Sequence, residues 1–395
     1  MSNGDLTIGF EQFDKNDPLR GAVLSLRAQG NLLYETSTGI ARRYNCSTKG
    51  FWYRLEAPPL RPGAEEVIDI AAQQYPRVLH EWELIPGGYR SVTALVFREE
   101  QRQNTFRDGW LFVVRIRDKN CGQLAYFARA GRAGQVDLQT RVPELSSFPE
   151  KTVSVAGLGC IGAAAAVQFA RAGLGNIRLL DPDIVDPGTT VRWPFGLSAS
   201  GRAKVEVIAR FLSLDYPFTK VDGRVNAIGR VDSPDVQNLP WLCDGSDLLF
   251  DATVESGVNH LLSELARERK IPYVYIAATN GGWGGMVICI RPERTAGCWM
   301  CAQHALEDGT ITPPPESEPF IQPYGCADPT FTGANFDTDE IPLMGVRMAT
   351  AALNPSYPSP DWDVAVLAMR AEDGHLVAPQ WKTYRLDRHA ECQNH

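Results

Sequence analysis

The clearest pattern of apolar and polar positions lies in the middle of the chain, over residues 151–204. A short apolar run, Val153–Ala156, predicts a buried strand, and the alanine-rich stretch Ala163–Ala172 predicts a helix directly after it. A second apolar run, Ile177–Leu180, predicts the next strand. Strand, helix and strand in this order predict a βαβ unit, in which the two strands lie parallel.

The alternation of strands and helices continues toward the end of the chain. Apolar runs predict strands at 221–227, 247–251, 271–277, 286–291 and 381–386, and helical periodicity predicts helices at 199–212, 254–269 and 338–353. Short connections between these elements favour a mostly parallel sheet with helices on both faces. The sequence therefore predicts the α/β class and a Rossmann-like, doubly wound sheet for this part of the chain.

The first part of the chain has a different pattern. Strand-like segments occur at 21–26, 32–35, 93–97 and 110–116, and a helix-like segment at 65–74. This mixture predicts a smaller α+β domain over residues 1–146, which we interpret as a binding or dimerising module, ahead of a second domain at 147–395. Pro143–Lys151, with two prolines, two serines and no periodicity, is the predicted junction.

Three glycines follow the first strand of the βαβ unit. In Gly157-Leu158-Gly159-Cys160-Ile161-Gly162, the first glycine suits a tight turn, the second suits close approach of a phosphate or ribose, and the third suits close helix–strand packing. Asp181 ends the next strand, 19 residues after Gly162, where an acid reaches a ribose hydroxyl. Because the N-terminus of a helix attracts anions, the unit predicts a nucleotide site.

The residues that follow indicate which nucleotide binds. Asp183 lies two residues after Asp181, Arg192 comes next, and Lys204 lies early in the following predicted helix. Two cations suit a triphosphate better than the pyrophosphate of a dinucleotide, because Arg grips phosphate with a planar fork and Lys acts as a point charge. For each cation alone a solvated surface residue is the alternative, but the set favours phosphate binding.

With these residues, the chain resembles the adenylate-forming enzymes that activate ubiquitin and its relatives, including the MoeB and ThiF activators of sulfur carriers. The resemblance covers residues 141–395. The matching residues are Gly157, Gly159, Gly162, Asp181, Asp183, Arg192, Gly201 and Lys204. Thr189 stands where the family usually has Asn. The resemblance implies binding of ATP with Mg²⁺ and a protein C-terminus as the second substrate.

The resemblance also implies a magnesium ligand after the predicted strand at 247–251. Where the family has Asp-Cys-Thr-Asp-Asn, this chain has Asp251-Ala252-Thr253-Val254-Glu255, so that Val254 replaces the second Asp. Asp251 or Glu255 then remains to hold Mg²⁺, which takes hard oxygen ligands and keeps most of its waters.

An arginine ahead of the glycine turn reaches the ATP phosphates in the resembled family, often those of the partner subunit. Arg129, Arg132 and Arg141 cluster before the predicted junction, and Arg141 is the candidate for this role. A surface arginine is the alternative. Because family members generally pair, the resemblance implies a homodimer.

Two later segments are expected to handle the second substrate. Residues 278–285 hold four glycines around Trp283, and they either line the path of an extended peptide tail or form a plain turn. Proline-rich residues 304–326 resemble the family's crossover loop, which passes over nucleotide and tail. By the same resemblance, Cys326 is the candidate nucleophile that takes the acyl group as a thioester, with a packed thiol as the alternative. Cys160, a rival at a helix N-terminus, is interpreted as packing.

Cysteine and histidine spacing near the C-terminus predicts a metal site. Cys298-Trp299-Met300-Cys301 has knuckle spacing, and family members often carry a second such pair near the C-terminus. Here that pair is Cys392 and His395, with His389 as the substitute for the terminal histidine. Three thiolates and an imidazole make a closed tetrahedral zinc site, which is structural and ties the C-terminal strand to the domain. Unliganded thiols are the alternative.

Composition limits the partners and the compartment. The formal net charge of −8 argues against nucleic acid or an anionic membrane as the main partner. The polar, acidic start has no signal-peptide pattern, and no apolar run reaches the roughly 20 residues that span a bilayer. Nine cysteines without a regular framework favour a reducing, cytoplasmic compartment.

These patterns and the resemblance lead to one main hypothesis and three alternatives. The main hypothesis is an ATP-dependent activating enzyme that adenylates the C-terminal Gly of a ubiquitin-like protein, forms a thioester and delivers the acyl group to a conjugating enzyme. By analogy, it would serve a bacterial ubiquitin-like pathway, one used in antiviral defence. The alternatives are a sulfur-carrier adenylyltransferase without an acyl-thioester, an NAD-dependent oxidoreductase, and a non-catalytic scaffold.

Overall fold

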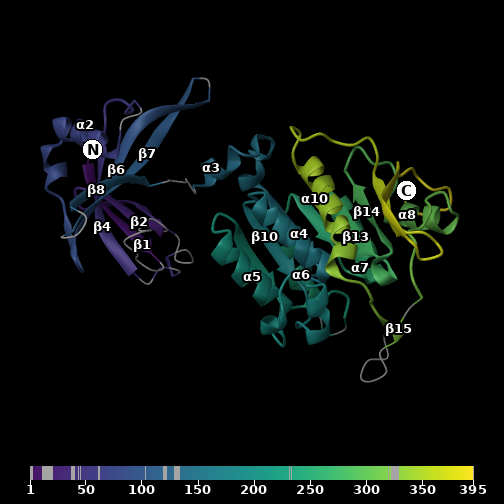
Figure 1. The fold of residues 1–395 in the computed structure, drawn as a ribbon. Coiled ribbons are helices and arrows are strands. Elements are labelled where there is room, and N and C mark those ends of the chain that lie inside the picture. The colour runs from purple at the N-terminus through teal and green to yellow at the C-terminus, as the bar shows by residue number, and fades with distance from the viewer. Residues whose placement is uncertain are drawn as a thin grey trace. The chain divides into compact units, whose positions relative to one another are not determined.

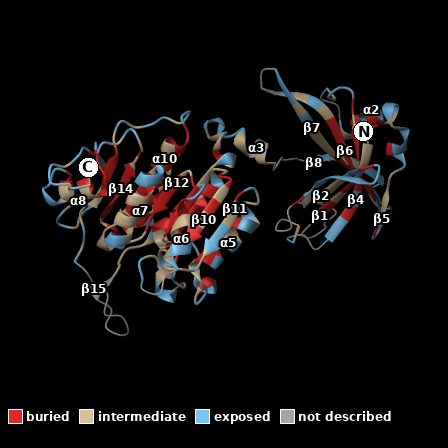
Figure 2. Cartoon of the chain, turned by 180° about the vertical axis from the view of Figure 1, so that it is seen from behind, coloured by how far each residue is buried: buried red, intermediate tan, exposed pale blue. Residues whose placement is uncertain are grey.

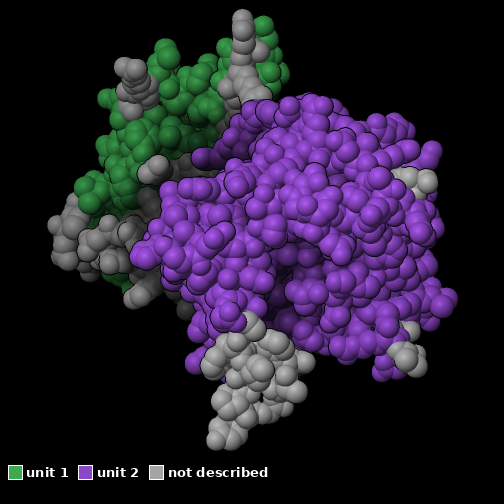
Figure 3. All heavy atoms as spheres, turned by 90° about the vertical axis from the view of Figure 1, so that its right-hand side faces the viewer, with its two compact units in different colours: residues 1–133 green, residues 134–395 purple. Residues whose placement is uncertain are grey.

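The computed structural model describes residues 3–10, 21–36, 41–42, 44, 46–60, 63–102, 104–118, 122–128, 134–230, 232, 234–318, 320–321 and 329–394. The chain divides into two compact units, residues 1–133 and residues 134–395, which Figure 3 shows in green and purple. In the part that the structure describes, no helix is both long enough and apolar enough to span a bilayer.

Unit 1 is built on one eight-stranded sheet. Its strands are β1 (Asn3–Phe10), β2 (Gly21–Ala28), β3 (Asn31–Glu35), β4 (Cys46–Arg54), β5 (Glu83–Ile85), β6 (Gly88–Arg102), β7 (Thr105–Asp118) and β8 (Gly122–Ala128). They follow the order β3-β2-β1-β4-β6-β7-β8, with β5 paired to β6, and only the β4–β6 pair is parallel among the pairs described. The helix α2 (Ala64–Gln74) buries Val67, Ile68 and Ala71 against one face of this sheet. The α+β prediction for this unit is confirmed.

Unit 2 is a sheet covered by helices. The strands are β9 (Thr152–Ala156), β10 (Asn176–Leu180), β11 (Lys220–Arg224), β12 (Leu248–Asp251), β13 (Tyr273–Ala278), β14 (Gly284–Ile290), β17 (Val364–Arg370) and β18 (Leu376–Tyr384). The helices are α3 (Gln135–Gln139), α4 (Cys160–Arg171), α5 (Lys204–Asp215), α6 (Asp235–Cys243), α7 (Ser256–Arg269), α8 (Trp299–Glu307), α9 (Asn335–Thr338) and α10 (Glu340–Leu353). The two-residue strands β15 (Phe320–Ile321) and β16 (Pro329–Thr330) pair with each other.

The sheet of unit 2 has the order β11-β10-β9-β12-β13-β14-β17-β18. The first five strands are parallel, and the last three add to them in antiparallel fashion. Buried strands form its centre (Figures 1 and 2). This arrangement confirms the predicted Rossmann-like, doubly wound fold.

Alternating side chains of the strands build a core on each face of this sheet. On one face, Val153 and Val155 of β9 pack in a cluster with residues of α4, α5 and α10. On the other face, Ala156 belongs to a cluster formed with α6, α7 and α8. Helices therefore cover both faces, as the parallel strands require.

The predicted junction, 143–151, lies within unit 2. Phe148 is fully buried in the larger core, and its carbonyl accepts a hydrogen bond from the Gly175 amide at 2.9 Å. The Asn354 side chain donates a hydrogen bond to the Glu144 carbonyl. The prolines of this segment occupy short 3₁₀ turns, η2 (Pro143–Leu145) and η3 (Phe148–Glu150), which lack helical periodicity, and Phe148 of η3 is the buried residue among them.

Candidate functional site

The order of the strands fixes where a crevice opens. From β9 the chain continues to β10 on one side, whereas the other neighbour of β9 is β12, which comes later in the chain. In open α/β sheets, ligands bind outside the carboxyl ends of the strands where the order reverses in this way. The loops after β9, β10 and β12 all reach this point.

Each of the three glycines in the turn after β9 is explained by a different local feature. Gly157 has a φ of +84°, and its backbone lies against the loop after β12, where an added Cβ would come within 2.6 Å of the Ala252 carbonyl oxygen. An added Cβ on Gly162 would lie 2.0 Å from the Gly157 carbonyl oxygen. Gly159 is the N-cap of α4, and nothing lies within 4 Å of its added Cβ. The space beside Gly159 and the free N–H groups of α4 suit an anion.

Asp181 and Asp183 follow β10 and meet Lys204 at the start of α5. Each Asp181 oxygen accepts one backbone N–H, from Leu158 at 2.6 Å and from Asp183 at 2.8 Å. Lys204 Nζ lies 2.9 Å from Asp183 Oδ2 and 3.8 Å from Asp181 Oδ1. Burial raises the pKa of Asp181, and the Lys204 charge opposes this rise. The structure thus brings the predicted acid pair and the lysine together beside the glycine turn.

Arg192 lies near the N-terminus of α4. Burial raises the pKa of the Cys160 thiol at this terminus. The positive charge of Arg192 is the largest influence in the opposite direction. A raised pKa disfavours the thiolate, which agrees with the interpretation of Cys160 as packing. The Arg192 guanidinium carbon also lies 5.2 Å from the ring centre of Phe331.

Trp193 is a site residue that the sequence interpretation missed. It is buried, and its indole Nε1 donates a hydrogen bond of 2.8 Å to the Leu158 carbonyl within the glycine turn. The tryptophan therefore holds the turn in place behind the nucleotide crevice. Its position directly after Arg192 was the available signal, because a large aromatic with one polar atom usually finds a hydrogen-bond partner when it is buried.

The two candidate magnesium ligands differ in their surroundings in the loop after β12. Asp251 is fully buried, and its carboxylate accepts hydrogen bonds from the Thr253 amide, the Thr253 hydroxyl, the Asn259 amide and the Tyr273 hydroxyl, at 2.7–2.9 Å. These donors occupy the acceptor positions of both oxygens, so the carboxylate shapes the loop. Glu255 is the exposed N-cap of α7, and binding of Mg²⁺ by either carboxylate stays a prediction. Asn259 is a second missed residue, a lone amide on the buried face of a helix.

The glycine-rich segment 278–285 contacts the crossover loop of the same chain. The Ser317 amide donates to the Asn280 carbonyl at 3.0 Å on the outgoing side of that loop. The described residues that follow the crossover loop, 329–337, form a returning arm: an added Cβ at Gly282 would lie 2.6 Å from the Asp337 Cβ, and one at Gly333 would lie 3.0 Å from the Gly282 nitrogen. The glycines thus allow both the crossover loop and this returning arm to approach. Lining of a peptide path by this segment stays a prediction.

The other predicted residues fall on exposed or undescribed parts of the chain. Arg141 is exposed on the turn after α3. Arg129, Arg132 and Cys326 lie outside the described residues. The segment 304–326 begins within α8, and the extended part of the crossover loop starts after that helix.

Three of the four predicted zinc ligands come together. The sulfurs of Cys298, Cys301 and Cys392 all lie within 4.8 Å of one another, and Cys298 Sγ is 3.8 Å from Cys301 Sγ and 3.6 Å from Cys392 Sγ. This donor set fits zinc, which prefers thiolates in closed structural sites. His395, the fourth predicted ligand, lies outside the described residues.

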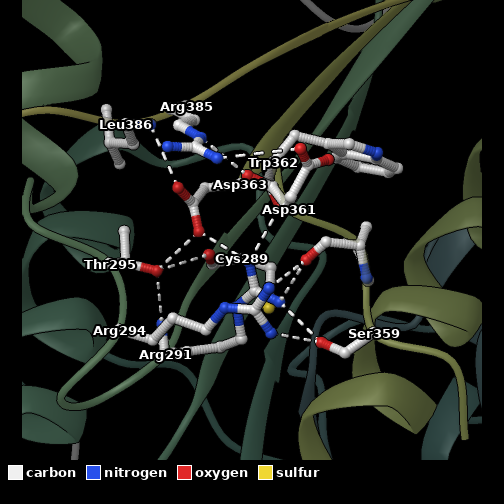
Figure 4. Close-up of polar contacts among 11 residues, drawn as sticks. Cys289, Arg291, Arg294, Thr295, Ser359, Asp361, Trp362, Asp363, Arg385 and Leu386 are labelled. Carbon is white, nitrogen blue, oxygen red and sulfur yellow. Dashed lines mark hydrogen bonds and ion pairs between the residues drawn. The ribbon is translucent and has the colours of Figure 1, made fainter.

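A buried ion pair between Arg291 and Asp363 joins the ends of neighbouring strands in the same unit (Figure 4). The Arg291 guanidinium donates to Asp363 Oδ1 at 2.7 Å, and the Thr295 hydroxyl donates to the same oxygen at 2.7 Å. The Leu386 amide donates to Asp363 Oδ2 at 3.1 Å. One carboxylate thus joins the end of β14, the start of β17 and the segment after β18, and this frame positions the chain just before Cys298.

The chain belongs to the ThiF family, whose model matches residues 133–336. It is 31% identical to the uncharacterized protein y4qC of Sinorhizobium fredii, over 98% of this chain and 70% of that protein. It is 33% identical to the uncharacterized protein y4oA of the same organism, over 87% of this chain and 61% of that protein. Ubiquitin-like modifier-activating enzyme 5 of Drosophila willistoni is 27% identical over 41% of each chain.

These findings confirm the family that the motifs indicate. Membership of the ThiF family supports ATP-dependent adenylation of a carboxylate substrate. The chain spans only part of the length of the two Sinorhizobium proteins, so the substrate and the later steps are matters for proposal.

Proposed function

We propose that the chain activates the C-terminal carboxylate of a ubiquitin-like protein by adenylation with ATP, then takes the acyl group on Cys326 and delivers it to a conjugating enzyme. The observation that carries the proposal is the convergence of Asp181, Lys204 and Arg192 on the loops around the N-terminus of α4. The modifier-activating enzyme among the relatives supports the choice of a ubiquitin-like substrate.

The nucleotide is held from its two ends. Each oxygen of Asp181 accepts a hydrogen bond from one backbone N–H. Each keeps a lone pair to which a ribose hydroxyl donates a hydrogen bond. The phosphates lie toward the open space at Gly159, the α4 N-terminus and Arg192. Binding of the phosphates draws Arg192 from its contact with Phe331, because a guanidinium pairs more strongly with phosphate than with an aromatic ring.

The first step joins the two substrates. A carboxylate oxygen of the carrier's C-terminus attacks the α-phosphorus of ATP, the bond from that phosphorus to the bridging oxygen breaks, and pyrophosphate leaves with the electron pair. The products are the acyl-adenylate and pyrophosphate. Arg192 and Lys204 are preorganised charges that stabilise the negative charge that develops on the phosphates. Mg²⁺, when bound through Glu255, neutralises part of the same charge.

In the second step, the Cys326 thiolate attacks the acyl carbon. A C–S bond forms, the C–O bond to the phosphate breaks, and AMP leaves. A conjugating-enzyme cysteine then takes the acyl group by thioester exchange, which regenerates the Cys326 thiol. Zinc bound by the three cysteines ties the C-terminal segment to α8 and takes no part in these steps. A homodimer would place Arg141 of each chain toward the phosphates of the other.

The test is exchange of radiolabelled pyrophosphate into ATP by the purified chain, with small proteins that end in Gly-Gly as the candidate carriers. We expect carrier-dependent exchange and an adduct between carrier and enzyme that thiols cleave. The variant Cys326→Ala should keep the exchange and lose the adduct. Arg192→Ala should lose both, with a control variant, Arg210→Ala, on the far part of α5 that changes neither.

Other outcomes select the alternative functions. Exchange without any thiol-sensitive adduct selects a sulfur-carrier adenylyltransferase. Oxidation or reduction of a nicotinamide with no use of ATP selects an oxidoreductase. Absence of exchange with every Gly-Gly carrier, together with no binding of ATP, refutes the proposal and leaves a scaffold.

A further inference from the structure

A second group of potential metal ligands lies beside the three cysteines. His304, His389 and Glu391 each offer a ligand atom, and these atoms all lie within 4.8 Å of one another. Asp308 lies outside this group, and its Oδ2 lies 3.1 Å from His389 Nε2, where it orients the ring. We propose that His304, His389 and Glu391 bind a second divalent transition metal, through two nitrogens and one oxygen.

The orientation of the two imidazoles supports a shared ligand. The rings of His304 and His389 lie stacked, with their centres 5.0 Å apart and their planes 18° from parallel. His389 Nε2 lies 3.1 Å from the Asp308 carboxylate, which accepts hydrogen bonds, so Nε2 carries the ring proton and Nδ1 keeps the lone pair, to which the Glu391 amide donates at 3.2 Å. His304 Nδ1 lies 4.0 Å from Glu391 Oε2. Donation of one ring N–H to a carboxylate fixes the ring and leaves the other nitrogen for a metal, as is usual for metal-binding histidines, and at Nδ1 the metal would take the place of the Glu391 amide hydrogen.

The same two segments carry both donor groups. Along α8 and its C-cap, Cys301, His304 and Asp308 follow one another at helical spacing. In the C-terminal segment, His389 and Glu391 directly precede Cys392. The turn of α8 with Cys301 is therefore followed by a turn with His304 and Asp308. Both turns face the C-terminal segment that holds His389, Glu391 and Cys392.

His389 is assigned to this second site and not to the cysteine cluster. Its backbone amide donates to Cys301 Sγ at 3.3 Å, which is a supporting contact for a thiolate. Its ring nitrogens face Asp308 and the Glu391 amide. The role of a substitute fourth ligand for zinc therefore does not suit His389, and His395 stays the predicted ligand there.

The donors define the class of metal. Two imidazoles and one carboxylate suit Zn²⁺, Co²⁺, Fe²⁺ or Mn²⁺, whereas the neighbouring thiols prefer softer metals. The ligand carboxylate of Glu391 and the carboxylate of Asp308 behind the His389 ring together balance the charge of a divalent ion. Asp308 Oδ1 accepts the Thr310 amide hydrogen at 2.9 Å, which holds the carboxylate with its other oxygen toward His389. Exposed fractions of 24% for the His304 side chain and 18% for His389 leave a path for the ion.

Cobalt titration of the metal-free full-length chain tests the proposal, because it separates the two donor sets by their spectra. Cobalt bound by thiolates gives an intense sulfur-to-metal charge-transfer band, whereas cobalt bound by nitrogen and oxygen gives only weak ligand-field bands. We expect the chain to bind two equivalents of Co²⁺ in two phases of the titration, one with the charge-transfer band and one with only the weak bands. Elemental analysis of the chain loaded with Zn²⁺ should likewise give two metal equivalents.

Variants assign each phase. His304→Ala and, as a milder change, Glu391→Gln should each lose the phase without charge transfer and one of the two equivalents, while the charge-transfer band stays. Cys298→Ser should weaken that band and keep the other phase. The control is His375→Ala, since His375 is an exposed histidine with its Nδ1 3.0 Å from Asp373 Oδ2 on another hairpin, and both equivalents should persist.

Three results would overturn the proposal. The first is a single equivalent in the unaltered chain with the charge-transfer band alone. The second is loss of the charge-transfer band in His304→Ala or Glu391→Gln, which would mean that these residues act on the thiol site. The third is loss of the second equivalent in His375→Ala, which would show that exposed histidines bind the metal without a built site.

Discussion

Lys204 balances the charge of the nucleotide crevice. It lies between the carboxylates of Asp181 and Asp183, which approach its Nζ to 3.8 Å and 2.9 Å. Burial raises the pKa of Asp181, and the Lys204 charge opposes that rise. The same lysine faces the phosphates in the proposed reaction. One residue thus links the folded state and the chemistry, and the two roles can be measured separately.

The variant Lys204→Met should destabilise the chain in a manner that depends on pH. Without the lysine charge, the pKa of Asp181 rises further above its unfolded value. A raised folded pKa gives stability at low pH that is lost as the pH rises through that pKa. We expect a loss of roughly 1–3 kcal/mol in the free energy of unfolding at neutral pH, which shrinks toward the acid range. Urea unfolding over a pH series measures it.

A control for this series is Lys220→Met, since Lys220 is an exposed lysine at the start of β11. It should change the free energy of unfolding by less than about 0.5 kcal/mol at every pH. An equal destabilisation by Lys204→Met at acid and neutral pH would contradict the role assigned to Lys204.

The glycines of the first turn give a second prediction. Gly162→Ala should unfold the chain or shift the turn, because its Cβ would lie 2.0 Å from a backbone oxygen. Gly159→Ala should leave the melting temperature nearly unchanged, since φ at Gly159 is −62° and its added Cβ meets nothing within 4 Å. If Gly159 leaves room for a phosphate, ATP affinity should nevertheless fall by at least tenfold, about 1.4 kcal/mol. Calorimetric titration with ATP measures it, and unchanged affinity in a folded Gly159→Ala chain would show that the nucleotide does not approach there.

At the scale of elements, the crossover loop is fixed to the body by glycine contacts. Its outgoing arm bonds to Asn280, and its returning arm packs on Gly282. These contacts place α9 beside α4, and they let Phe331 reach Arg192. The position of the loop therefore depends on residues 278–285, which lie outside the loop itself.

Gly282→Ala should loosen the returning arm. Gly282 has a φ of +64°, and an added Cβ would lie 2.6 Å from the Asp337 Cβ. We expect faster chymotryptic cleavage within the segment 318–336 and weaker carrier-dependent exchange, while ATP affinity stays within about twofold. The control is Gly309→Ala, which has a similar positive φ of +79° in the same connection but open space around it. Equal cleavage rates for the two variants would contradict an anchoring role for Gly282.

Periodicity revealed those elements of unit 2 whose apolar faces are regular. The pattern predicted β9, α4 and β10 to within a few residues. It missed α6, where Pro240 interrupts the helical pattern. It also missed α8, which begins between Cys298 and Cys301. It also missed β17, which is apolar at nearly every position and shows no alternation. Short or fully buried elements lack a period, and only tertiary packing defines them.

The candidate site was predictable where chemistry and local spacing agree. Asp181 and Lys204 were predicted because their spacing from the glycine turn along the chain places them beside a nucleotide bound there. The bonding of the Asp251 carboxylate was not, because it depends on donors from Asn259 and Tyr273, which lie further along the chain. The group of His304, His389 and Glu391 was missed for the same reason, because His304 and His389 lie 85 residues apart in the sequence (389 − 304).

At the scale of the whole molecule, the division of the chain decides which parts can act alone. Unit 2 comprises residues 134–395, so the segment ahead of β9 belongs with the nucleotide fold. Phe148 lies in its core with no exposed surface, and Lys151 Nζ forms an ion pair with Asp247 Oδ1 at 2.9 Å. A boundary drawn from composition alone would fall inside this packed segment, because proline and serine also occur in turns that hold a core together.

Two truncations separate these boundaries. Residues 134–395 should give a cooperative unfolding transition and bind ATP with the affinity of the full chain, because the crevice and both cores lie within this unit. Residues 152–395 lack Phe148 and should be less stable by at least about 3–5 kcal/mol, the usual result of removing a buried phenylalanine. Urea unfolding and ATP titration of both fragments measure this, and Phe148→Ala in the full chain isolates the side chain. Equal stability of the two fragments would place the boundary after this segment and would assign residues 134–151 to the connection between the units.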